Sequence, residues 1–86
     1  MVDVQEVVLR LHNKLMKEEG IEGESSLDME MRPRNGITSV AIVSLLLDIE
    51  EELGIELDDY LIQIRKSNTI GMFIDIVKEA YEKQHQ

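Results

Sequence analysis

Ser39 is the residue of this sequence best placed for covalent chemistry, because it lies at the start of a predicted helix. Thr38 before it is a good N-cap, since its hydroxyl can accept a hydrogen bond from an N–H group that the first turn leaves unpaired. Ser39 then occupies the first helical position with its own hydroxyl free. A Thr-Ser pair is also common where a helix is merely capped, so the dipeptide alone does not decide between capping and chemistry.

Other candidate reactive groups are few. The chain has no cysteine, which excludes a disulfide framework and a thiolate metal site. His12 lies beside the apolar stripe of the first predicted helix with no second ligand four residues on, so we expect a surface or helix-boundary histidine and no metal site. Segment 48–59 lacks the alternating acidic ligands and central glycine of a calcium loop. Without a Ser-His-acid set, paired acids in a site or a glycine-rich phosphate loop, we expect a protein that is not an enzyme.

The helix that carries Ser39 has two apolar stripes. It begins after Thr38 and ends at Gly54, because glycine accepts the left-handed conformation that terminates helices. Val40, Val43 and Leu47 form one stripe, with two acids, Glu50 and Glu51, just beyond it. The other stripe recurs at helical spacing and is predicted to face the core: Ile42, Leu45, Leu46, Ile49 and Leu53. A helix in a small domain needs only one buried stripe, so the second indicates a docking surface for a partner.

Three further helices must position this one. Asp3 and Glu6 have the spacing of a capping box and open a helix over 4–18, stopped near Gly20. A long connection over 20–37 follows, in which alternating apolar residues at 27, 29 and 31 are expected to pin the chain onto the core. A short helix begins at 58–59. Asn68 or Thr69 caps a last helix, whose tail from residue 83 is expected to fray and whose stripe includes Ile70, Phe73, Ile74, Val77 and Tyr81. The prediction is an all-α, four-helix bundle in one domain, 1–86, with a long first loop and a short third helix.

The middle of the chain resembles acyl carrier proteins. That family has Asp-Ser-Leu at a helix start, here Thr38-Ser39-Val40, and a glutamate-rich helix end followed by a Gly-Ile-Glu-Ile-like segment, here EEELGIEL over 50–57. Thr-Ile-Gly at 69–71 resembles the start of the family's last helix. The resemblance implies a 4′-phosphopantetheine arm, taken from coenzyme A, on Ser39, and an acyl-carrier-type bundle. It implies that acyl chains shelter among Ile42, Leu45, Leu46, Ile49, Leu53, Ile70, Phe73, Ile74 and Val77.

The resemblance also implies function and partners. The chain would carry acyl or aminoacyl thioesters and present them to enzymes of a fatty acid, polyketide or nonribosomal-type pathway. Its partners would be a phosphopantetheinyl transferase and loading and biosynthetic enzymes with basic patches, docked at Thr38, Val40, Val43, Leu47, Glu50 and Glu51. The alternative is a helical protein–protein interaction module with the carrier fold that never receives the arm.

Several positions depart from the family. Thr38 replaces an aspartate that modifying enzymes often contact, and Ala41 and Ser44 stand where central fatty-acid carriers usually have acids. These departures favour a specialised carrier, such as a discrete carrier of a biosynthetic cluster or an aminoacyl carrier. Arg32 and Arg34 lie near the expected arm, where ordinary solvated charges are favoured over a contact with its phosphate.

The composition of the chain favours other proteins as its binding partners. The 86 residues carry a net charge of −9, and no lysine or arginine occurs between Asn35 and Ile64. This charge argues against nucleic acid and against an anionic membrane surface, and it favours partners with basic docking sites. No apolar run is long enough for a signal peptide or a membrane span, so we expect a cytoplasmic protein. We also expect it to be a monomer.

Overall fold

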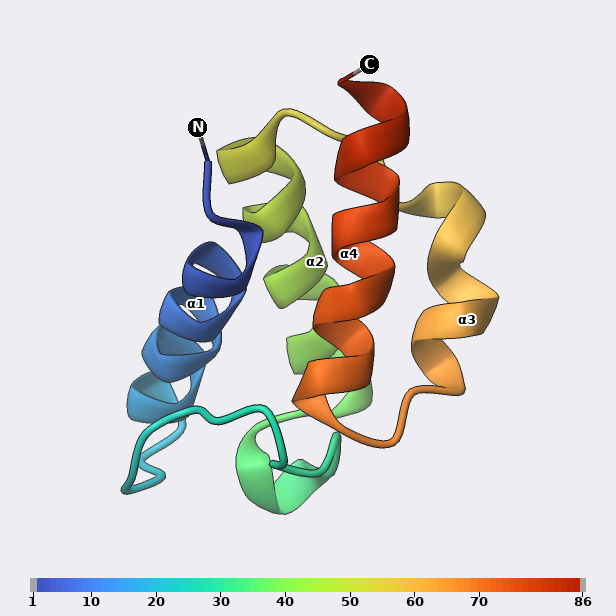
Figure 1. Cartoon of the computed structure of the whole chain (residues 1–86). Helices are drawn as coiled ribbons and strands as arrows, with labels where there is room; N and C mark the ends of the chain where they lie inside the picture. The colour runs from blue at the N-terminus through green and yellow to red at the C-terminus, as the bar shows by residue number, and fades with distance from the viewer. Residues whose placement is uncertain (1, 86) are drawn as a thin grey trace.

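Four α-helices form the computed structural model, which describes residues 2–85. They are α1 (Val4–Glu18), α2 (Ser39–Leu53), α3 (Leu61–Arg65) and α4 (Ile70–Gln84), with short 3-10 turns at Pro33–Asn35 and Asp58–Tyr60. Successive helices run in opposite directions, so α2 begins and α3 ends at the same end of the molecule (Figure 1). The described part of the chain contains no strand, and the predicted all-helical class with a short third helix is confirmed.

The helix ends follow the local chemistry that the sequence predicts. The Asp3 carboxylate accepts from the Glu6 N–H at 3.2 Å, and the Thr38 hydroxyl accepts from the Ala41 N–H at 3.0 Å. Thr69, one of the two candidates, caps α4 by accepting from the Met72 N–H at 3.2 Å. Gly54 ends α2 with φ of 65°, a conformation that costs a residue with a side chain about 1 kcal/mol or more.

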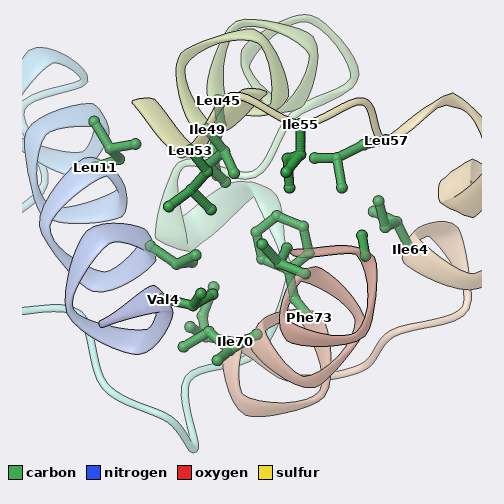
Figure 2. Packing of buried hydrophobic residues seen from close by; sticks show 14 of the residues in the cluster. Val4, Leu11, Leu45, Ile49, Leu53, Ile55, Leu57, Ile64, Ile70 and Phe73 are labelled. Carbon is green, nitrogen blue, oxygen red and sulfur yellow. The ribbon is translucent and has the colours of Figure 1, made fainter. Parts of the chain in front are cut away.

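The core is made of aliphatic side chains from all four helices around Phe73, as Figure 2 shows. On α2 the buried positions are Ala41, Leu45, Ile49 and Leu53. The prediction that Ile42 and Leu46 also lie in the core is only partly right, because both are half-buried. Each residue turns the helix by about 100°, which places these two on the side of α2 nearest α3.

The long connection is held by backbone hydrogen bonds to the start of α4. The Met31 N–H donates to the Asn68 carbonyl at 2.9 Å, and the Ile70 and Gly71 N–H groups donate to the Met29 and Leu27 carbonyls, each at 2.8 Å. Met29 and Met31 pack against the core as predicted, whereas Leu27 is exposed. The alternating pattern therefore corresponds to an extended segment paired with the backbone of α4's first turn.

His12 is buried, which contradicts the prediction of a surface or boundary histidine. Its side chain is 0% exposed, with Nε2 donating to the Asn35 carbonyl at 2.8 Å and Nδ1 2.6 Å from the Ser25 hydroxyl. Burial lowers the pKa of His12, and the hydrogen bond to Asn35 opposes that shift. The imidazole is thus a neutral link between α1 and the connection that leads to Ser39.

The end of the chain is also more ordered than predicted. Gln84 and Glu56 exchange two hydrogen bonds of 2.7 Å, from the Glu56 N–H to the Gln84 side chain and from that side chain to the Glu56 carbonyl. His85 donates to the Leu53 carbonyl at 3.1 Å and stacks on Tyr81. These contacts extend α4 beyond the point at which fraying was expected.

Candidate functional site

Ser39 lies at the first position of α2, and its side chain is exposed. The chain reaches it through the turn Pro33–Asn35, after which Gly36 adopts φ of 86°. A side chain at this glycine would be strained, so the turn depends on it. The Thr38 side chain accepts only from the Ala41 N–H, and within residues 2–85 the Ser39 and Val40 N–H groups have no hydrogen-bond partner. A free hydroxyl next to a partial positive charge suits an anionic substituent.

A cavity of about 380 Å³ opens beside Ser39, between α2, α3 and the connection. Its walls include Ile42, Val43 and Leu46 of α2, facing Leu61 and Ile64 of α3, and it is completed by Met31, Ile37, Thr38, Arg65 and Ser67. Ile42 and Leu46, the two half-buried members of the predicted acyl-pocket and core set, are therefore cavity walls. The rest of the predicted acyl-pocket residues lie in the close-packed core.

The predicted docking stripe is exposed. The exposed fractions are 83% for Val40, 55% for Val43 and 59% for Leu47. Val43 also lines the cavity, so the stripe and the cavity share an edge next to Ser39. Ile62 on α3 is 71% exposed, a feature that the sequence analysis did not single out. An exposed apolar stripe such as Val40, Val43 and Leu47 is typical of a contact surface for another protein.

The two predicted docking acids have different roles. Glu50 is half-buried, and its carboxylate accepts from the Leu57 N–H at 2.7 Å, which ties the segment after Gly54 back to α2. Glu51 is exposed and makes no ion pair with the described residues. Glu52 pairs with Arg10 of α1 at 3.2 Å. Of these acids, Glu51 is the one whose charge is available to a partner.

The arginines near the site also differ in their surroundings. Arg32 and Arg34 both pair with Glu30, Arg32 at 3.5 Å, which agrees with solvated charges and gives no contact with Ser39. Arg65, at the end of α3, lies on the cavity wall with Ser39. Sequence reasoning missed it, because the residues between Asp58 and Asn68 gave no firm register for the short helix.

Within residues 2–85, no group of three or more histidines and acids is placed to hold a metal ion. None of the helices described is both long enough and apolar enough to cross a bilayer.

Comparisons with protein-family models, with curated proteins and with solved structures gave no match to this chain. What the protein does is therefore inferred from its residues and their geometry.

Proposed function

We propose that this protein is an acyl carrier protein with the acyl-carrier type of bundle and a 4′-phosphopantetheine arm on Ser39. The observation that carries the proposal is the position of Ser39. It is exposed at the first position of α2, on the wall of a largely apolar cavity and beside an exposed apolar stripe. The family-like segments 38–40 and 50–57 lie at the two ends of this same helix.

The attachment step is a phosphoryl-group transfer to the serine. Ser39 Oγ attacks the phosphorus of coenzyme A that bears the pantetheine, and the bond from that phosphorus to adenosine 3′,5′-bisphosphate breaks. The serine proton passes to a base of the transferase or to water, and the first-turn N–H groups of α2 would stabilise the phosphodiester charge. Once attached, the arm supplies a terminal thiol, which a chain without cysteine otherwise lacks.

Val40, Val43, Leu47 and Glu51 would meet the partner enzymes. Their apolar side chains bury area on docking, and the exposed acid favours a partner with basic residues around an apolar patch. The cargo is an acyl or aminoacyl group of a biosynthetic pathway. Because Ala41 is buried and Ser44 is exposed but neutral, the start of this face carries no acid, which supports a specialised carrier over a general fatty-acid carrier.

The test is the intact mass of the protein after incubation with coenzyme A and a broad-specificity phosphopantetheinyl transferase. We expect a gain of one arm in the wild type and in Ser44→Ala, an exposed serine of the same helix, and no gain in Ser39→Ala. A folded wild type that gains no mass, or a Ser39→Ala variant that does, would contradict the proposal. The first outcome would favour the unmodified interaction module, since the exposed stripe of α2 does not require Ser39.

A further inference from the structure

Of the four arginines of the chain, Arg65 is the one without an ion pair within residues 2–85. Arg10 pairs with Glu52, and Arg32 and Arg34 pair with Glu30. Within residues 2–85, Arg65 has no carboxylate within ion-pair distance. It lies instead on the wall of the cavity that contains Ser39, where it is the only cationic side chain. A guanidinium presents a rigid fork of N–H donors that matches an oxyanion.

A second polar group lies in the same cavity. Ser67 is 7% exposed and lines the wall next to Arg65, with its hydroxyl donating to the Gln63 carbonyl at 3.2 Å. This hydroxyl has therefore used its one donor, and the guanidinium of Arg65 is the group on this wall that can still donate to an anion. Arg65 is exposed, and a purely hydrocarbon occupant would give its guanidinium no new hydrogen-bond partner, whereas an anion supplies one. The cavity, at about 380 Å³, is near the lower end of ligand pockets, which span roughly 300–1,000 Å³.

We propose that Arg65 binds an anionic group that the substituent on Ser39 brings into this cavity. This inference rests on the proposed function and specifies it further. The anion is an oxyanion from one of two sources: a carboxylate at the end of a short acyl cargo, or the phosphodiester of the arm. Both present the oxygens that the fork of a guanidinium binds, and Arg65 is an exposed side chain on a wall that faces apolar side chains.

The experiment compares four forms of the protein: unmodified, with the bare arm, and with the arm carrying a butyryl or a succinyl group. The two cargoes have four carbons each and differ in the terminal carboxylate. The transferase installs each form from the corresponding coenzyme A thioester, and intact mass confirms occupancy of Ser39. The first readout is the NMR signal of the Arg65 side-chain Nε–H, and the second is the melting temperature of each form.

If the cargo carboxylate is the ligand, the Arg65 signal shifts only in the succinyl form, which also melts higher than the butyryl form. If the phosphodiester is the ligand, the signal shifts equally in all three modified forms. Arg65→Gln should abolish the associated gain in melting temperature and Arg65→Lys should retain part of it. Arg32→Gln, which changes a paired arginine outside the cavity, should leave the gain intact.

An Arg65 signal that stays at its unmodified position in every modified form would overturn the inference. So would a gain in melting temperature that persists in Arg65→Gln. Because intact mass is read first, an unmodified Ser39 would be recognised as a failure of the proposed function rather than of the role of Arg65.

Discussion

At the scale of single residues, Thr38 and Ser39 have separate roles at the start of α2: Thr38 caps the helix, and Ser39 presents a free hydroxyl. The Thr38 hydroxyl accepts from the Ala41 N–H at 3.0 Å, so the cap does not require the Ser39 hydroxyl. Ser39 is exposed and lies one residue inside the helix. Within residues 2–85 the Ser39 hydroxyl makes no hydrogen bond that holds the helix end, so it is available for attachment of another group.

His12 gives a prediction for the pH dependence of stability. Its neutral ring donates to Asn35 and accepts from Ser25, and burial lowers its pKa below 6.5, the ordinary value. Below pH 6.5 the unfolded chain therefore binds a proton at His12 more readily than the folded chain does. Stability from this group is complete above pH 6.5 and falls as the pH drops below that value, by up to about 1.4 kcal/mol per pH unit.

The measurement is urea unfolding between pH 7.5 and 5.5 for the wild type and for His12→Gln, which keeps an N–H donor. We expect the wild type to lose more stability than the variant over this range. Equal losses in the two proteins would show that His12 does not titrate on unfolding.

At the scale of elements, α2 presents a different face to each neighbour. Leu45 is 2% exposed and faces the core, while Leu47 is 59% exposed on the docking stripe. We expect Leu45→Ala to cost about 2–5 kcal/mol of unfolding free energy, because it leaves a cavity. The same truncation at Leu47 should cost less than about 0.5 kcal/mol.

Chemical denaturation measures the unfolding free energies of both variants. The rate at which the transferase modifies the folded protein measures docking. Leu47→Ala should slow modification although it barely alters stability. Similar stability losses in the two variants would contradict the assignment of faces.

Glu50 and Glu51 provide a second contrast on the same helix. Glu50→Ala removes the acceptor of the Leu57 N–H and should destabilise the protein by about 1 kcal/mol. Glu51→Ala should leave stability within about 0.5 kcal/mol of the wild type and weaken docking instead. Thermal unfolding and transferase kinetics together separate these effects; a stable Glu50→Ala variant would mean that its carboxylate contributes nothing to the fold.

The sequence predicted those elements whose signals are local. Caps at Asp3, Thr38 and Thr69 and apolar spacing define α1, α2 and α4 within a few residues, because both depend on near neighbours. His12 and Arg65 could not be placed this way. The burial of His12 requires Ser25 and Asn35 from the connection, and the position of Arg65 requires α3 to lie across the cavity from α2.

At the scale of the whole molecule, the net charge of −9 predicts how partners find this protein. Attraction to a basic partner is screened over about 8 Å at physiological ionic strength. We therefore expect the transferase to become less efficient with rising salt, mainly through slower association. Stopped-flow association rates measured from low to high salt test this; rates independent of salt would remove electrostatic steering from the account.

The central claim is that Ser39 carries a phosphopantetheine arm. The most direct measurement is the mass of the protein purified from the cells that make it, followed by fragmentation of the tryptic peptide 35–65, which contains Ser39 and Ser44. The predicted result is a mass excess of one arm, located on Ser39 and absent from Ser44. A peptide of unmodified mass throughout, in protein from cells that contain an active transferase, would contradict the carrier function.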